Sequence, residues 1–154
     1  LLSSDVITDL RETLKTNLQM INEIKSALKN DRIFPYFQPI FDNKTKKIYK
    51  YESLIRMVKE DGSMVYPGPY FLDIAKKGKL YPQITKVLVE KVFSKIRESG
   101  QEFSMNLSSL DIEDPYMSAF LLNAIKENAD IADKLIVELL EDKDTQDYEV
   151  VKSF

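Results

Sequence analysis

Apolar residues recur with helical spacing along the first thirty residues of the chain. The two core series of a heptad pattern are Ile7, Leu14, Ile21 and Leu28, and Leu10, Asn17 and Ile24. About three heptads with the polar Asn17 in the seam are typical of a short coiled coil, which would support a homodimer. The same spacing also fits a single amphipathic helix that lies on the domain. We assign residues 1–31 to an N-terminal helix or linker.

Strand-like segments replace the helical pattern after residue 32. Residues 33–42 and 47–58 are rich in aromatic and β-branched side chains, and the Asn-Lys-Thr stretch between them is typical of a turn. The sequence therefore predicts a β-hairpin at the start of the main domain, which we place at residues 32–154.

Helices and strands alternate in the remainder of the chain. Predicted helices cover 67–77, 82–98 and 114–128, predicted strands cover 102–108 and 134–141, and a last helix begins near Thr145 or Gln146. Gly78 and Gly100 end the first two of these helices. The alternation predicts an α/β fold with a mainly parallel sheet and helices on its outside.

Composition limits the chemistry that this domain can carry. The 154 residues include no Cys and no His, which excludes disulfides, Cys- or His-ligated zinc, thiol nucleophiles and Ser-His-Asp triads. A bound metal would have to be a hard cation with oxygen ligands, such as Mg²⁺ or Mn²⁺. The net charge of -3 and the pI near 5.1 argue against duplex nucleic acid as a partner.

The chain contains no sequence signal for a membrane or for secretion. No apolar run approaches the roughly 18 residues of a membrane span, and no secretory signal opens the chain. We therefore expect a soluble, cytoplasmic protein, whose parent could be anchored through a segment outside this chain. Leu1 already lies within the helical pattern, so we also expect an upstream sensory or regulatory domain.

Polar residues lie in three strands at positions where an apolar side chain would be the ordinary choice. Alternation puts Glu52, Leu54 and Arg56 on one face of the second strand, while Asn106 lies in the third strand and Glu138 in the fourth. A buried, unpaired carboxylate costs several kcal/mol, so each glutamate needs a partner. Two glutamates and an asparagine from neighbouring strands could hold a hard cation at the C-terminal edge of the sheet, where parallel barrels place their active sites.

The same residues have plainer explanations. A glutamate in a strand more often lies at a sheet edge or in a salt bridge than on a metal. The Asn106-Leu107-Ser108 stretch could end a strand, or match a glycosylation pattern that a cytoplasmic protein would not use. On residue chemistry alone, the metal site is the less favoured interpretation.

Ordered sequence blocks change this balance. The blocks are 36–40 (YFQPI), 51–56 (YESLIR), 69–75 (PYFLDIA), 103–108 (FSMNLS) and 136–141 (IVELLE). In order and spacing they resemble the EAL family, which consists of cyclic di-GMP phosphodiesterases and their degenerate relatives. The resemblance spans roughly residues 28–154. It implies the N-terminal half of a TIM-like (β/α)8 barrel of EAL type, preceded by the N-terminal helix.

The resemblance also implies a catalytic metal centre. Glu52 is similar to the signature metal ligand of the family, Asn106 to its amide ligand and Glu138 to its second carboxylate ligand. Together these residues would hold Mg²⁺ or Mn²⁺, with two ions in the intact site.

Other positions resemble the residues that bind or support the substrate. Gln38 is similar to a glutamine near the metal and the substrate, Leu54 to a residue of the guanine pocket, and Arg56 to the arginine that holds a phosphate. Glu141 matches the last residue of the family's Glu-x-Thr-Glu block and would support the site.

The chain departs from the family pattern at two positions. Ser53 stands in the signature triplet where the family has Ala, and Leu140 stands where the family usually has Thr. The leucine could remove a hydroxyl that orients the site. The family's paired Asp-Asp block is expected beyond Phe154, so the chain carries only about half of a barrel.

These observations lead to three functional hypotheses. The first is metal-dependent hydrolysis of cyclic di-GMP to linear pGpG by the intact parent, a cyclic-guanylate-specific phosphodiesterase, with the fragment itself inactive. The second is a degenerate EAL domain that binds cyclic di-GMP or a protein partner as a non-catalytic signalling module. The third is a structural or dimerisation fragment in which the N-terminal helix matters most.

Overall fold

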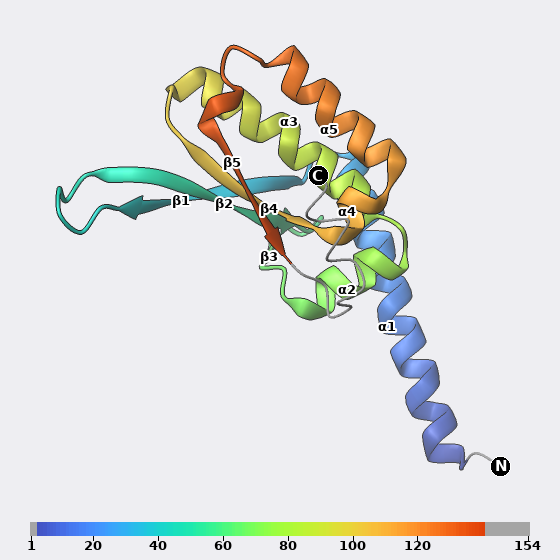
Figure 1. Cartoon of the computed structure of the whole chain (residues 1–154). Coiled ribbons are helices and arrows are strands. Elements are labelled where there is room, and N and C mark those ends of the chain that lie inside the picture. The colour runs from blue at the N-terminus through green and yellow to red at the C-terminus, as the bar shows by residue number, and fades with distance from the viewer. Residues whose placement is uncertain (1–2, 141–154) are drawn as a thin grey trace.

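A computed structural model gives the fold of residues 3–140, with the backbone alone described for Pro69 and Tyr70. Helices and strands succeed one another along the chain (Figure 1). In chain order they are α1 (Ser4–Lys29), β1 (Ile33–Phe41), β2 (Ile48–Val58), β3 (Met64–Val65), α2 (Pro69–Lys77), α3 (Tyr81–Ser99), β4 (Phe103–Ser108), α4 (Ser109–Glu113), α5 (Pro115–Glu127), the 3₁₀ turn η1 (Ala132–Lys134) and β5 (Leu135–Leu140). Glu141 and the predicted last helix lie outside the described residues.

The strands of the described residues form one sheet. Its order is β1-β2-β4-β5, and the short β3 pairs with the end of β2. β1 and β2 form the predicted antiparallel hairpin, whose far end extends beyond the helices (Figure 1). β2, β4 and β5 run parallel to one another. The predicted α/β fold, with an opening hairpin and a mainly parallel sheet, is confirmed.

The pairing between β2 and β4 is short. It joins Tyr51–Ser53 to Phe103–Met105, and the ladder ends there. β4 stays paired with β5 for its whole length, up to Ser108 beside Leu140. The sheet is therefore open between β2 and β4 from Leu54 onward. The candidate residues Leu54, Arg56 and Asn106 lie along this opening.

Local sequence signals explain where the helices begin and end. Gly100 ends α3 in the left-handed conformation, with φ of 71°, which glycine adopts without a steric penalty. Asp114 caps α5 by accepting hydrogen bonds from the backbone N–H groups of Tyr116 and Met117. The helix predicted from residue 67 begins two residues later, at Pro69.

No helix in residues 3–140 is long and apolar enough to cross a membrane.

The short helix α4 was not predicted. It follows β4 without a loop, because Ser108 is both the last strand residue and the N-cap of the helix. The Ser108 side chain accepts from the backbone N–H of Leu110, and the Asp111 side chain accepts from the backbone N–H of Ser108. This capping box turns the chain at once from strand to helix at the C-terminal end of β4.

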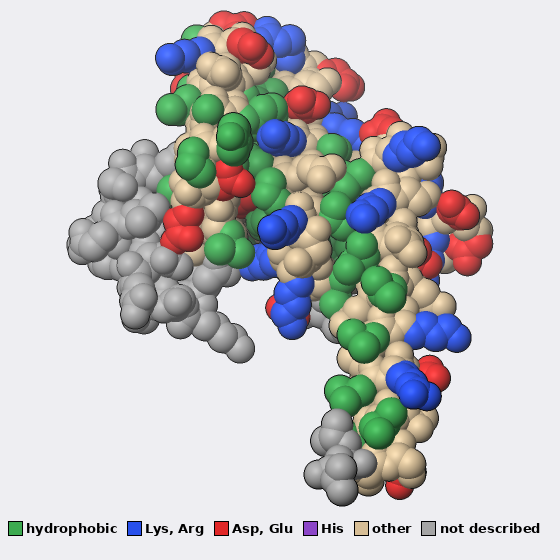
Figure 2. Space-filling model, turned by 90° about the vertical axis from the view of Figure 1, so that its right-hand side faces the viewer, with side chains coloured by type: hydrophobic (Ala, Val, Ile, Leu, Met, Phe, Trp, Pro, Cys, Tyr) green, Lys and Arg blue, Asp and Glu red, His purple; other side chains and the backbone are tan. Residues whose placement is uncertain are grey.

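The two halves of α1 have different surroundings. Ile24 and Ala27 are fully buried, and Met20, Ile21 and Leu28 pack against the same core. The first half extends away from the domain, and its exposed apolar side chains lie along it (Figures 1 and 2). These exposed residues are Val6, Ile7, Leu10, Leu14 and Leu18. The second half of the heptad pattern therefore packs on the chain's own domain, as the amphipathic-helix alternative requires. The first half is exposed and could contact a second helix.

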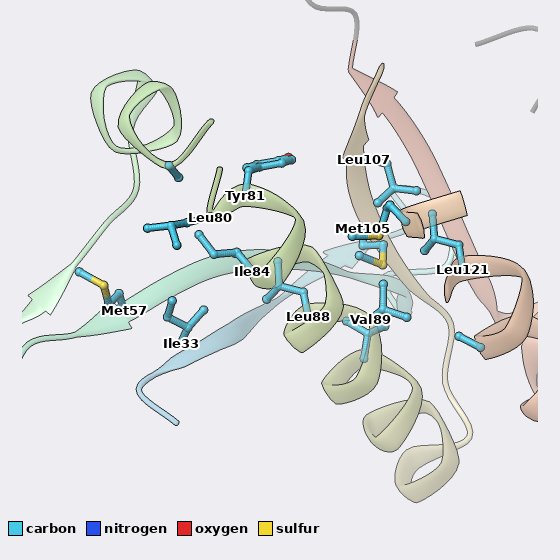
Figure 3. Close-up of a cluster of buried hydrophobic side chains, with 14 of the residues drawn as sticks. Ile33, Met57, Leu80, Tyr81, Ile84, Leu88, Val89, Met105, Leu107 and Leu121 are labelled. Atoms are coloured by element: carbon cyan, nitrogen blue, oxygen red, sulfur yellow. The ribbon is translucent and has the colours of Figure 1, made fainter. Parts of the chain in front are cut away.

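The core lies between the sheet and the α3–α5 layer. Val89 of α3 lies near Met105 of β4, and Ile84 of the same helix lies near Ile33 of β1 and Met57 of β2 (Figure 3). The rings of Tyr51 and Phe103 stack with centroids 5.0 Å apart, which joins β2 to β4 on this side of the sheet. Because strand side chains alternate, the even-numbered residues of β4, including Asn106, face the opposite side. The helices therefore pack on one face of the sheet, and Asn106 lies on the other face.

Candidate functional site

The strand register places the predicted site residues in two neighbouring pairs. Gln38 of β1 is the Cα partner of Glu52 of β2. Asn106 of β4 is the Cα partner of Glu138 of β5. The two pairs are connected through Ser104, which is the partner of Glu52 and lies two residues before Asn106. Since side chains two residues apart share a face, all four predicted residues lie on the same side of the sheet.

A small cavity lies where β2 and β4 separate. Its volume is about 160 Å³. Three of the predicted residues line it: Leu54, Arg56 and Asn106. Leu140, at the position where the family usually has Thr, lines it as well. The cavity therefore brings the predicted phosphate ligand, guanine-pocket residue and amide ligand to one place, with apolar lining from α2, α3, β4 and β5. Gln38, Glu52 and Glu138 do not line it.

Ser53, the residue that replaces Ala in the signature triplet, lies at the edge of this cavity. Its side chain is 6% exposed, and its hydroxyl oxygen has no hydrogen-bond partner among the described residues. A buried hydroxyl without a partner destabilises the fold, because it has lost its bonds to water. Ser53 is thus tolerated for its small size rather than for its polarity.

The guanidinium of Arg56 is held between two tyrosine rings. It lies 4.8 Å from the centroid of Tyr66 and 5.5 Å from that of Tyr36. Its Nη1 also donates a 2.7 Å hydrogen bond to the carbonyl oxygen of Ile55. Stacking of this kind fixes the plane of a guanidinium while leaving it charged. The sequence analysis singled out Arg56 but neither tyrosine, which come from β1 and from the loop after β3.

Lys50 is a further charged residue of this face that the sequence analysis missed. Its Nζ lies 3.1 Å from Oε1 of Glu138, and its side chain is 14% exposed. The hydrogen bond to Glu138 is the main cause that raises the pKa of Lys50 above its ordinary value. Alternation could have revealed Lys50, because it lies two residues before Glu52 in β2. The predicted ligand Glu138 is therefore engaged in an ion pair.

The donor set of the candidate site suits a hard cation. Glu52 and Glu138 offer carboxylate oxygens and Asn106 offers an amide oxygen, the ligand types that Mg²⁺ and Mn²⁺ prefer. Within residues 3–140, no group of three or more Asp, Glu, His or Cys side chains is arranged to hold a metal. The described residues therefore fit the predicted metal only as a mixed carboxylate and amide site, in which two of the three donors are charged.

Comparison with known proteins defines the family. The sequence profile of the EAL domain matches residues 21–154, and the chain therefore belongs to the EAL domain family. It is 31% identical over 101 residues to "Signaling protein YkoW" of Bacillus subtilis (strain 168). It is 24% identical over 136 residues to "Probable cyclic di-GMP phosphodiesterase PdeI" of Escherichia coli (strain K12). These matches cover 64% and 83% of this chain, but the chain spans only 12% and 17% of the two relatives.

Solved structures confirm the fold. The EAL domain of Xanthomonas citri FimX, determined in complex with c-diGMP, superimposes with a TM-score of 0.74 at 16% sequence identity. The match covers 91% of this chain and 56% of the FimX chain. The expected N-terminal part of a TIM-like barrel of EAL type, with a preceding helix, is thus confirmed, and so is the resemblance to the EAL family.

Proposed function

We propose that this chain contributes part of the active site of a metal-dependent cyclic di-GMP phosphodiesterase, which hydrolyses its substrate to linear pGpG. The observation that carries the proposal is the register of the site. Asn106 lies beside Glu138, and Gln38 beside Glu52, on one face of the sheet. One relative named as a probable cyclic di-GMP phosphodiesterase, and solved EAL structures in complex with cyclic di-GMP, support this choice of substrate.

Glu52, Asn106 and Glu138 are the proposed ligands of Mg²⁺ or Mn²⁺, with two ions in a complete site. When bound, such ions polarise the phosphodiester and lower the pKa of water. The chain's own contribution is to set oxygen donors on neighbouring strands of a rigid sheet. Asn106 and Glu138 are adjacent Cα partners, so one ion can be reached from both without backbone movement.

Arg56, Leu54 and Gln38 are the proposed substrate-binding residues. The charged, planar guanidinium of Arg56 suits a phosphate oxygen pair, and the two tyrosine rings restrict its orientation. Leu54 offers apolar surface in the same cavity for a guanine ring. Gln38 lies next to Glu52, where its amide could orient either the carboxylate or the substrate. Glu141 is the proposed supporting residue.

A non-catalytic sensor of cyclic di-GMP is the second candidate function. Two observations favour it over hydrolysis. Glu138 is paired with Lys50, and Leu140 lines the cavity in place of the usual Thr. A site that has lost metal affinity in this way could still bind the dinucleotide through Arg56. Hydrolysis remains the preferred proposal because all three ligand positions are occupied by oxygen donors.

The N-terminal helix, within residues 1–31, is proposed as a signalling linker in a cytoplasmic protein with an upstream regulatory domain, although its second half packs into the domain core. The exposed apolar residues of its first half could pair with the same helix of a second copy. Sedimentation of the chain with and without residues 1–18 tests this: a dimer that becomes a monomer on truncation supports pairing, and an unchanged mass contradicts it.

The catalytic proposal is tested by product analysis. A protein that carries the complete barrel is incubated with cyclic di-GMP and Mg²⁺ or Mn²⁺, and pGpG is separated by chromatography. Metal-dependent pGpG supports the enzyme. Binding of cyclic di-GMP without product supports the sensor, and neither binding nor product contradicts both. The 154-residue chain alone is expected to form no pGpG, because it supplies only part of the barrel.

A further inference from the structure

Lys50 and Glu138 form an ion pair between strands that are not neighbours. Lys50 lies on β2 and Glu138 on β5, and β4 runs between them. The lysine side chain crosses the face of β4 to place its Nζ 3.1 Å from Oε1 of Glu138. That side chain is 14% exposed, whereas the glutamate is 45% exposed. The ammonium group is thus the more enclosed partner and lies on the same face as Glu52 and Asn106.

An ammonium group in this position competes with a metal ion for the same oxygen. Mg²⁺ binds oxygen ligands at about 2.0–2.1 Å, and an oxygen so engaged is a poor acceptor for a nearby cation. The positive charge of Lys50 would also repel a divalent ion at short range. Glu52 and Glu138 together carry two negative charges, and Lys50 cancels one of them. The lysine stem has four flexible carbons, so the ammonium can leave without any backbone movement.

We propose that Lys50 is an internal competitor for the divalent ion, which occupies Glu138 in the metal-free protein and lowers the affinity of the site for metal. The proposal rests on the proposed function, because it takes Glu138 as a metal ligand. It assigns to Lys50 the role of setting the metal concentration at which the site becomes loaded. Lys50 acts on the metal through its contact with Glu138 and does not itself bind metal or substrate.

An ordinary salt bridge would behave differently. A partly exposed pair contributes little to stability, and its loss should leave metal binding unchanged. Lys95 provides a matched control: it pairs with Glu98 at 3.6 Å near the end of α3, the helix that packs on the opposite face of the sheet. Removing Lys95 changes the net charge of the chain by the same amount without touching the candidate site.

The test is Mn²⁺ binding to the full chain, measured by calorimetry, with folding checked by circular dichroism in the absence of metal. The variants are K50M, which keeps most of the apolar stem, K50Q, K50R, and the control K95M. Lys50→Met and Lys50→Gln are expected to bind Mn²⁺ about tenfold more tightly than the wild type, since they remove a positive charge that competes for the ligand oxygen. Lys50→Arg keeps the positive charge and is expected to bind no more tightly than the wild type, as is Lys95→Met.

Glu138→Gln separates this proposal from the proposed function. If Glu138→Gln weakens Mn²⁺ binding but Lys50→Met and Lys50→Gln leave it unchanged or weaken it, Glu138 is a ligand and the competitor role of Lys50 is overturned. If Glu138→Gln leaves the affinity unchanged, the ligand role fails and the competitor role fails with it. Absence of Mn²⁺ binding in the wild type and in all Lys50 variants overturns both. Should Lys50→Met fail to fold, Lys50→Gln decides the outcome.

Discussion

Asn106 and Glu138 are Cα partners on adjacent parallel strands, so an amide and a carboxylate stand side by side on one face of the sheet. The two residues are 32 positions apart in the sequence, and α4, α5 and η1 lie between them. The β-α-β arrangement is what brings them together, since parallel strands need a crossover connection. This relationship is the basis of the proposed metal site.

Glu52→Gln is expected to reduce hydrolysis of cyclic di-GMP by a protein with the complete barrel at least about 100-fold. The substitution keeps the shape of the side chain but removes one of the two carboxylate charges available to a metal. Product formation is measured at saturating Mn²⁺, with Glu90→Gln on the exposed surface of α3 as the control. Near-normal turnover by the Glu52 variant would exclude a ligand role.

Arg56→Lys is expected to raise KM for cyclic di-GMP about tenfold while leaving the fold intact. The lysine keeps the charge but loses the planar fork and the stacking between Tyr36 and Tyr66. Tyr66→Leu should have a smaller effect in the same direction, and Tyr66→Phe almost none, because the ring is what restricts the guanidinium. Steady-state kinetics of the three variants test this order. A KM for Arg56→Lys equal to that of the wild type would show that Arg56 does not contact the substrate.

Ser53→Ala is expected to stabilise the domain by about 1 kcal/mol, because it removes a buried hydroxyl that lacks a hydrogen-bond partner. Ser104→Ala is the matched control, since Ser104 is also buried but its hydroxyl donates to the carbonyl oxygen of Tyr51. Urea unfolding of both variants gives the free energies. A loss of stability in Ser53→Ala as large as that in Ser104→Ala would mean that the Ser53 hydroxyl has a partner.

Asp130→Asn is expected to lower stability near neutral pH but not in strong acid. The Arg97 guanidinium, which donates to Asp130 at 2.8 Å, lowers the pKa of this carboxyl below its ordinary 3.8. A carboxyl whose folded pKa is lowered adds stability above its unfolded pKa, and this contribution is lost as the pH falls through the folded value. Thermal midpoints of the wild type and the variant should therefore differ at pH 6 and converge below pH 3.8. A difference that persists unchanged in acid would assign it to packing.

Most of the fold could be predicted because its signals are local. The alternating apolar pattern of β4 and the glycine that ends α3 each depend on only a few neighbouring residues. The helix α4 was missed because Ser108 serves as strand end and helix cap at once, which leaves no loop for a sequence pattern to reveal. The sequence left the coiled coil and the single amphipathic helix as alternatives, because periodicity cannot tell whether Ile24 faces a second helix or the chain's own core.

The candidate site was predictable only in part. Alternation and the family resemblance gave the faces of Glu52, Asn106 and Glu138. The contact between Lys50 and Glu138 spans an intervening strand, so it depends on strand order and on the direction of a flexible side chain. The stacking of Tyr66 on Arg56 likewise depends on the path of the loop after β3. Neither feature follows from residue spacing.

The central claim is that Glu52, Asn106 and Glu138 hold one divalent ion, and anomalous scattering from Mn²⁺ tests it most directly. Crystals of a protein with the complete barrel, grown with Mn²⁺ and cyclic di-GMP, are measured near the manganese absorption edge. We expect an anomalous peak about 2.1 Å from oxygens of all three side chains, with Lys50 turned away from Glu138. A bound dinucleotide without a peak at these residues, or manganese held only by other residues, would contradict it.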